Sequence, residues 1–233
     1  MAPRFVLLHS PLLGPLAWRA VAAELTARGH VAETPAWTPL SEAAEPFYVT
    51  LADRMAARLG SPEEAPVLVA HSGAGALIPA VAARLPGVAG VIYADAILPH
   101  PGRSWFDTAP PELARQLRDG AQMGELPPWS DWWPPGALER LVPDAAQREP
   151  LLAELEPLPL SWFEERAPLD AWTGPTAYLQ LSGAYDAESQ VAARSGWPLL
   201  RHPLHHLAML THPQAVAAAI QSLAQRLSEP AHG

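Results

Sequence analysis

The sequence contains no cysteine and no lysine. Without cysteine, disulfides, thiolate nucleophiles and cysteine-based zinc sites are excluded, so any nucleophile must be an oxygen. All 15 basic residues are arginine, they form no cluster, and the formal net charge of −9 argues against a nucleic-acid partner. No stretch approaches the roughly 20 consecutive apolar residues of a membrane span, so no membrane partner is expected.

The composition that remains predicts one folded domain. With 233 residues, 49% hydrophobic and 17% charged, the chain can bury a sizeable core and differs strongly from disordered proteins. The absence of cysteine and of a signal-peptide layout favours a cytoplasmic location. The composition leaves the oligomeric state open, a homodimer included.

Apolar runs alternate with helical periodicities over residues 1–98. A short buried strand is expected wherever a continuous apolar run is bounded by glycine or proline, and a helix wherever apolar residues recur at helical spacing. The expected strands are residues 4–9, 30–34, 67–70 and 88–98, and the expected helices are residues 16–28, 46–59 and 73–87. This alternation indicates an α/β fold with a parallel sheet covered on both faces.

Residues 99–172, called the insertion below, interrupt the alternation. They hold six of the nine tryptophans and proline-rich stretches such as LPPWSDWWPPG, which cannot continue a sheet because proline lacks an N–H. We predict that the insertion is partly helical and forms a cap. A strand, a helix, a strand and a last helix follow it, so residues 1–98 and 173–233 form the core of the single domain.

Ser72 lies at a corner between an apolar run and a series of small residues, in LVAHSGAGAL. A serine attacks only where a base removes its proton and where the chain presents it to substrate, as a strained strand-to-helix turn does. Such a nucleophile elbow needs small residues two positions before and after the serine, here Ala70 and Ala74. We favour this interpretation, with a plain helix-capping serine as the alternative.

A general base is expected from the loop after the final strand. His206 in HHLAMLTHPQAV lies there, shortly before the last helix, and His202 and His205 are close alternatives. With a nucleophile at Ser72, we favour His206.

Together these features resemble the α/β-hydrolases. The stretch RFVLLHSPLLGPLAWRAVAAELTARGHVAE resembles the small branch that contains plant methylesterases and hydroxynitrile lyases, whose chains also begin with a strand and a His-Gly type loop. The resemblance extends over the chain outside the insertion. It implies an α/β-hydrolase fold with a mostly parallel central sheet, and a catalytic triad in which Ser72 is the nucleophile and His206 the base. It also implies that no cofactor and no metal is needed.

Two aspartates compete for the acid of the triad. Asp186 in LSGAYDAES follows the next-to-last strand, where the family usually places its carboxylate. Asp95 in YADAILP ends the preceding strand, from which some family members take their acid. Asp186 lies closer to His206 in sequence than is usual in the family, and it also suits the first turn of a helix. We favour Asp95 and keep Asp186 as the alternative.

The expected oxyanion hole departs from the family pattern. It needs one backbone N–H from the residue after the nucleophile, Gly73, and a second from the loop after the first strand. By resemblance the second position is Pro11, which has no N–H. We expect Leu12 to turn its amide inward or Ser10 to contribute its hydroxyl, unless the chemistry is not ordinary ester hydrolysis.

The tryptophans of the insertion predict an apolar substrate pocket over Ser72. For each single tryptophan, packing within the insertion's own core is the alternative. The expected lining consists of His9 with Trp105, Trp129, Trp132, Trp133, Trp162 and Trp172.

The sequence therefore predicts a serine hydrolase, an esterase or thioesterase that acts on a small hydrophobic or aromatic ester through an acyl-enzyme. One alternative is a lyase or cyclase on the same scaffold, suggested by Ser10 and Pro11. Plant hydroxynitrile lyases, however, carry a lysine after the catalytic histidine, where this chain has Leu207. The other alternative is a ligand-binding hydrolase relative with weak turnover.

Overall fold

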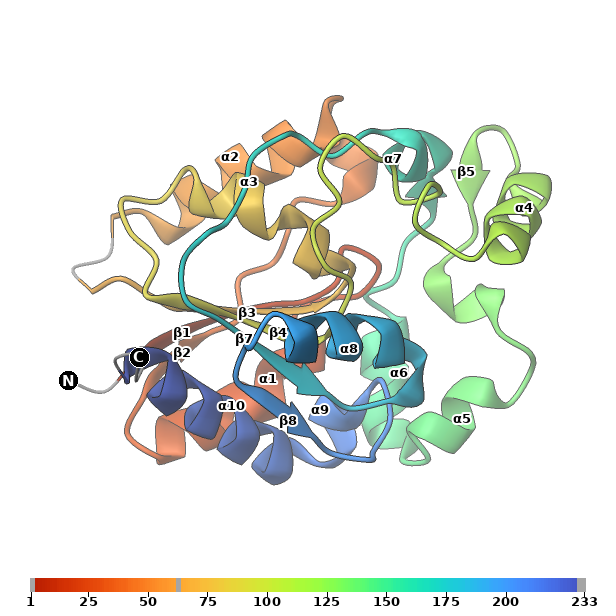
Figure 1. Ribbon diagram of the computed structural model, residues 1–233. Coiled ribbons are helices and arrows are strands. Elements are labelled where there is room, and N and C mark those ends of the chain that lie inside the picture. The colour runs from red at the N-terminus through yellow and green to blue at the C-terminus, as the bar shows by residue number, and fades with distance from the viewer. Residues whose placement is uncertain (1–2, 62–63, 230–233) are drawn as a thin grey trace.

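A computed structural model describes residues 3–61 and 64–229 and places a six-stranded sheet at the centre of the molecule (Figure 1). The strand order is β2-β1-β3-β4-β7-β8, and every neighbouring pair is parallel. The strands are β1 (Arg4–Leu8), β2 (Val31–Glu33), β3 (Val67–Ser72), β4 (Gly90–Ala96), β7 (Thr176–Gln180) and β8 (Leu199–Arg201). The parallel sheet predicted from the alternation is confirmed.

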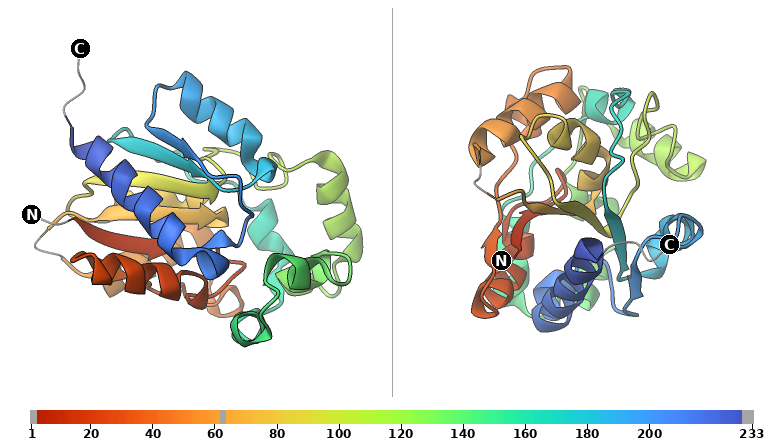
Figure 2. Two further views of the ribbon diagram at one scale, coloured as in Figure 1. Left: turned by 90° about the horizontal axis from the view of Figure 1, so that it is seen from below. Right: turned by 60° about the vertical axis from the view of Figure 1, so that its left-hand side comes forward.

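Helices cover both faces of the sheet (Figures 1 and 2). Successive residues of β3 point to opposite faces. Leu68 belongs to the same buried apolar cluster as Leu51 of α2, whereas Val69 belongs to the cluster that contains Trp18 of α1 and Ile220 of α10. Each face thus has its own apolar core. The helices outside the insertion are α1 (Leu16–Ala27), α2 (Phe47–Leu59), α3 (Ile78–Ala82), α8 (Asp186–Arg194), α9 (Ala208–Thr211) and α10 (Pro213–Ser228).

The helix expected over residues 73–87 is shorter and begins differently. A 3-10 helix covers Gly73–Leu77, and α3 follows directly. Pro79 has no N–H and cannot bond the carbonyl of Gly75 in the α-helical pattern, which accounts for the tighter turn at the start.

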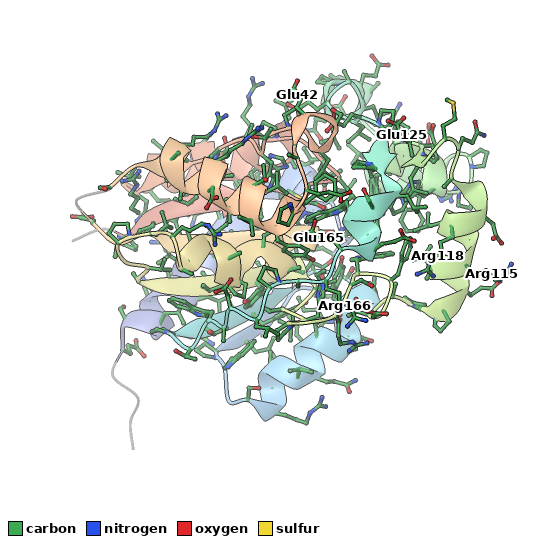
Figure 3. The ribbon with its side chains drawn as sticks, turned by 90° about the horizontal axis from the view of Figure 1, so that it is seen from above. Glu42, Arg115, Arg118, Glu125, Glu165 and Arg166 are labelled. Atoms are coloured by element: carbon green, nitrogen blue, oxygen red, sulfur yellow. The ribbon has the colours of Figure 1, made fainter. Side chains whose placement is uncertain are left out.

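The insertion connects β4 to β7 and lies at the carboxyl end of the sheet (Figures 1 and 2). It contains short helices and one small antiparallel strand pair, in agreement with the prediction that it is partly helical. Its elements are α4 (Pro111–Gly120), β5 (Glu125–Leu126), a 3-10 helix at Trp129–Trp132, α5 (Ala137–Leu141), α6 (Ala145–Leu152), β6 (Leu158–Pro159) and α7 (Leu160–Glu164). Arg115 of α4 projects outward, whereas Arg118 faces the rest of the insertion, where it lies over the ring of Phe106 and 3.8 Å from Glu164 of α7 (Figure 3).

Three glutamates attach the insertion to the core by capping helices there. Each capped helix follows a proline and has no capping side chain of its own, so its first N–H groups need a partner from elsewhere. A carboxylate is favoured there because the helix dipole is positive at this end. The three helices are α1, a short 3-10 helix at Leu40–Glu42, and α2. The bonds run from Leu16 N–H to Glu154 (3.1 Å), from Leu40 N–H to Glu156 (2.9 Å), and from Phe47 and Tyr48 N–H to Glu165 (2.6 and 2.9 Å; Figure 3).

Among the described residues, no helix combines the length and the apolar character needed to cross a bilayer.

Candidate active site

Ser72 ends the central strand β3 in a strained conformation, with φ of 53° and ψ of −126°. A positive φ costs a non-glycine residue about 1–3 kcal/mol and is retained where the surroundings enforce it, often at active sites. The side chain makes no capping hydrogen bond to the turn that follows, so it does not act as the helix cap that the sequence left open.

Three small residues allow this sharp turn. Ala70 and Ala74, the two positions singled out from the sequence, are both fully buried. Gly75 is a further requirement that the sequence analysis missed, because a Cβ there would lie 1.9 Å from the carbonyl oxygen of Ile97. The turn thus passes so close to the end of β4 that position 75 has no room for a side chain.

Asp95 reaches the site through an irregularity in the neighbouring strand. In the β3–β4 pair, His71 lies opposite Ala94 but Ser72 lies opposite Ala96, so β4 has one extra residue at Asp95. Asp95 also has a positive φ, 45°. Bulges of this kind redirect a side chain, and here the redirected carboxylate is fully buried at the carboxyl end of the sheet.

The buried carboxylate of Asp95 has a full set of hydrogen-bond donors. The backbone N–H groups of Leu181 and Ser182 donate to Oδ1 at 2.8 and 2.9 Å, and the hydroxyl of Ser182 donates to Oδ2 at 2.6 Å. His206 donates from Nδ1 to Oδ2 at 2.8 Å. Burial by itself raises the pKa of the Asp95 carboxyl, but these bonds and the nearby imidazole outweigh it and hold the pKa below its usual value.

The other candidate acid lies elsewhere. Asp186 is exposed on the first turn of α8, where it accepts a hydrogen bond from Gln180. Because the Nδ1 proton of His206 goes to Asp95, the geometry favours Asp95 over Asp186 as the group that orients the imidazole.

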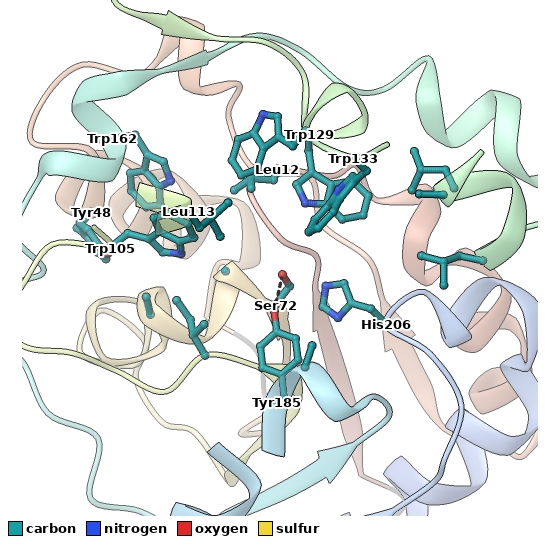
Figure 4. Close-up of a pocket in the computed structure, with 18 residues that line it drawn as sticks. Leu12, Tyr48, Ser72, Trp105, Leu113, Trp129, Trp133, Trp162, Tyr185 and His206 are labelled. Atoms are coloured by element: carbon teal, nitrogen blue, oxygen red, sulfur yellow. Dashed lines mark hydrogen bonds between the residues drawn. The ribbon is translucent and has the colours of Figure 1, made fainter. Parts of the chain in front are cut away.

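His206 lies in the loop between β8 and α9, with its ring beside Ser72 (Figure 4). Nδ1 is occupied by Asp95, which leaves Nε2 free to accept a proton. The backbone of His206 is also held, because the Nε2–H of His71 donates to the carbonyl of His206 at 3.0 Å. Of the two alternative bases, His205 bonds Thr211 at 2.8 Å, and His202 lines a separate surface groove.

Tyr185 is a site residue that the sequence analysis missed. Its hydroxyl oxygen lies 3.3 Å from Ser72 Oγ, and its ring stacks on the imidazole of His206 with centroids 5.1 Å apart (Figure 4). Ser72 is hydrogen-bonded to Tyr185 and not to His206 in this structure. No spacing in the sequence indicates this contact, because Tyr185 comes from the turn before α8.

The predicted oxyanion donors are only partly directed at Ser72. Gly73 and Leu12 both border the cavity next to Ser72. The N–H of Leu12, however, donates to the hydroxyl of Ser10 at 3.3 Å, and Ser10 is buried and does not line the cavity. The amide of Leu12 is therefore bound by Ser10, and Gly73 remains the predicted backbone donor that borders the cavity beside the nucleophile.

A cavity of about 280 Å³ opens above Ser72, between the sheet and the insertion (Figure 4). No Asp, Glu or Arg of the described residues lines it. Its walls include five of the six predicted tryptophans, Trp105, Trp129, Trp132, Trp133 and Trp162, together with Tyr48, Leu12 and Leu113. The tryptophans therefore form the wall of a cavity that faces the serine.

Two predicted lining residues lie outside this cavity. Trp172 donates from Nε1 to the hydroxyl of Thr176 at 3.1 Å, next to the start of β7. His9 is a correction: its ring is buried and faces a second cavity, behind the loop after β1. Its Nδ1–H donates to the carbonyl of Ser10 at 2.7 Å, and its Nε2 accepts the Trp37 N–H at 3.4 Å.

Within the part of the chain that the structure describes, no three histidine or carboxylate side chains are grouped so that they could hold a metal ion.

No family model and no curated protein sequence matches this chain. Solved structures do match. An extracellular α/β-hydrolase from a Paenibacillus species, described as sharing structural and functional homology with tobacco salicylic acid binding protein 2, aligns with a TM-score of 0.75 and 22% identity over 95% of this chain and 98% of its own. A pyrethroid hydrolase from Sphingobium faniae JZ-2 aligns with a TM-score of 0.71 and 20% identity over 97% and 98%. Polyneuridine aldehyde esterase aligns with a TM-score of 0.69 and 18% identity over 96% and 100%.

Proposed function

Since the chain has the α/β-hydrolase fold that its resemblance predicted, we propose that it is a carboxylic-ester hydrolase that works through an acyl-enzyme. One observation carries the proposal. Ser72 stands on a strained turn beside a histidine that is hydrogen-bonded at 2.8 Å to a buried aspartate, at the floor of an apolar cavity.

Each group has a defined part in the proposed reaction. Ser72 Oγ adds to the carbonyl carbon of the ester while its proton passes to His206 Nε2, and Asp95 stabilises the imidazolium through Nδ1–H. The oxyanion accepts the N–H of Gly73. When the intermediate collapses, His206 protonates the departing alcohol or thiol, and a water deprotonated by His206 then releases the acid from Ser72.

The cavity indicates the kind of ester. An apolar wall without Asp, Glu or Arg side chains among the described residues offers no partner for a charged substrate, and burying an unpaired charge is strongly unfavourable. Aromatic walls fit a neutral substrate with a hydrophobic or aromatic acyl group. The names of two neighbours, an esterase and a pyrethroid hydrolase, support ester hydrolysis as the reaction.

The lyase or cyclase alternative is weaker. It depends on a hydroxyl at position 10 that handles the substrate, whereas Ser10 is buried, binds the amide of Leu12 and does not border the cavity. The position after His206, where plant hydroxynitrile lyases carry a lysine, is occupied here by Leu207, which is fully buried and apolar.

A panel of p-nitrophenyl esters with graded acyl chains tests the proposal, with Ser72→Ala as the matched variant. We expect kcat/KM to rise with acyl length until the cavity is filled, and Ser72→Ala to abolish turnover. Turnover that is retained in Ser72→Ala, or no hydrolysis of any ester by the folded wild type, contradicts the proposal.

A further inference from the structure

The hydroxyl of Tyr185 has no part in the reaction described so far. Its hydrogen-bond partner among the described residues is Ser72 Oγ, at 3.3 Å. A tyrosine hydroxyl in contact with the attacking atom must lose or exchange this bond during the reaction, because Ser72 Oγ becomes bonded to the acyl carbon. The Tyr185 hydroxyl is therefore released from Ser72 Oγ at the step in which negative charge develops on the oxygens of the substrate.

Tyr185 is held so that the hydroxyl stays at this place. It ends the 3-10 turn Gly183–Tyr185 between β7 and α8, and its ring stacks on His206 with an interplanar angle of 16°. Burial, with a smaller contribution from the Asp95 charge, raises the pKa of Tyr185 above its ordinary value, so the phenol keeps its proton and can donate.

The position of the ring decides which substrate oxygen the hydroxyl can meet. Figure 4 shows Tyr185 and Leu12 on opposite sides of Ser72, with His206 beside Tyr185. The oxyanion is expected on the side of Gly73 and Leu12, which both border the cavity there. The leaving group is expected on the side of His206, because His206 delivers its proton.

We propose that Tyr185 is a further catalytic residue, which donates its hydroxyl proton in a hydrogen bond to the leaving-group oxygen of the ester. This inference depends on the proposed ester hydrolysis. Before attack the Tyr185 O–H donates to Ser72 Oγ; once Oγ is bonded to the acyl carbon, the O–H turns to the departing oxygen, where negative charge accumulates. Hydrogen bonds to charged acceptors are stronger, so the exchange is favourable.

All protons are accounted for in this step. The proton that leaves with the alcohol comes from His206 Nε2, which received it from Ser72. Tyr185 keeps its own proton throughout and changes only its hydrogen-bond acceptor. The contribution is therefore largest where the departing oxygen is most basic, since such an oxygen carries the most negative charge when the bond to carbon breaks.

The test is Tyr185→Phe with esters that share one acyl group and differ in the alcohol, from p-nitrophenyl through phenyl to alkyl. We measure kcat/KM, which reports the steps up to acylation. The expected loss is a few-fold for p-nitrophenyl and grows to about 10²-fold for the alkyl esters, in the range found for single transition-state donors. Tyr93→Phe is the matched control, a buried tyrosine of β4 outside the cavity.

The results separate this inference from the proposed function. If Tyr185→Phe lowers kcat/KM by the same factor for every alcohol, or leaves it unchanged while the wild type turns over and Ser72→Ala does not, the leaving-group role is wrong and ester hydrolysis stands. If the wild type hydrolyses none of the esters, both fail together. Thermal unfolding of Tyr185→Phe alongside Tyr93→Phe shows whether any loss comes from a general destabilisation.

Discussion

The sheet and the insertion contribute to the same cavity in different ways. On the sheet side, Ser72, Asp95 and His206 come from strand ends and the adjoining loop. The Asp95 carboxylate accepts hydrogen bonds of 2.6 to 2.9 Å, one of them from His206, while Ser72 is held by the strained turn at the end of β3. On the insertion side, the groups that face the cavity are large apolar rings. The glutamates of the insertion that bond to the core lie elsewhere, where they cap core helices.

This difference suggests a division of tasks. A reacting group must be oriented within a fraction of an ångström, and the rigid strand ends with their hydrogen bonds provide that orientation. Substrate selection requires a shape, which can be changed by replacing aromatic side chains without disturbing the strands. We therefore expect substitutions on the sheet side to lower the rate for all esters, and substitutions on the insertion side to change which esters are used.

The largest effect is expected for Asp95→Asn. An amide cannot stabilise the imidazolium and favours the wrong tautomer of His206, so kcat should fall about 10⁴-fold for every ester. Asp186→Asn is the control and should change kcat by no more than a few-fold. Steady-state kinetics on the two purified variants measures both, and a larger loss in Asp186→Asn reverses the assignment of the acid.

Acid should lower the stability of the fold. Burial lowers the pKa of His9 from 6.5 to about 4, and burial together with His206 lowers the pKa of His71 as well. Below pH 6.5 the unfolded chain therefore binds protons that the folded chain does not, and stability falls as pH drops toward 4. Each such histidine contributes about 1.4 kcal/mol per pH unit.

Urea unfolding between pH 8 and pH 4.5 checks this expectation. The free energy of unfolding should be nearly constant from pH 8 to 7 and should decline below 6.5. His9→Gln should make the free energy of unfolding depend less steeply on pH, since it removes one of the buried histidines whose pKa is lowered in the folded chain. A free energy that stays constant down to pH 5 contradicts the account of neutral buried histidines.

On the insertion side, Trp133→Leu should act on substrate choice. Trp133 lines the cavity and is 42% exposed at its rim, so its loss costs contact area and little stability. We expect kcat/KM to fall about tenfold for long aromatic esters, the equivalent of about 1.4 kcal/mol, and to change little for acetate esters. Trp172→Leu, in the insertion but outside the cavity, is the control; equal losses for short and long esters contradict the division of tasks.

The smallest effect is expected for Glu165→Gln, which keeps the shape of the side chain but removes the charge that faces the first turn of α2. Loss of a favourable cap interaction should lower the free energy of unfolding by about 1 kcal/mol. Glu125→Gln, an exposed residue of β5, is the control for a charge removed elsewhere on the insertion. Equal stability of the two variants means that the carboxylate of Glu165 does not help to attach the insertion.

Much of the fold follows from local sequence patterns. Continuous apolar runs such as Leu68–Ala70 identify buried parallel strands, and the small residues around Ser72 identify the turn that follows one of them. These features depend on neighbours in the chain, so one sequence is sufficient to predict them. The same holds for the interruption of the alternation by the proline-rich insertion.

Other parts of the site depend on contacts between distant segments and could not be predicted. The bulge at Asp95 appears only when β4 is paired with β3, so the sequence favours Asp95 over Asp186 but does not show how the Asp95 carboxylate reaches His206. Tyr185 meets Ser72 across 113 positions of sequence. His9 was predicted to line the pocket, but its ring bonds backbone groups of its own loop and of Trp37.

The most direct test of the central claim is the labelling of the active-site serine. The wild type and Ser72→Ala are incubated with a fluorophosphonate, which reacts only with an activated serine, and the modified peptide is identified by mass spectrometry. The account predicts a single adduct on Ser72 in the wild type and none in Ser72→Ala. A folded wild type that remains unlabelled, or an adduct that persists in Ser72→Ala, contradicts it.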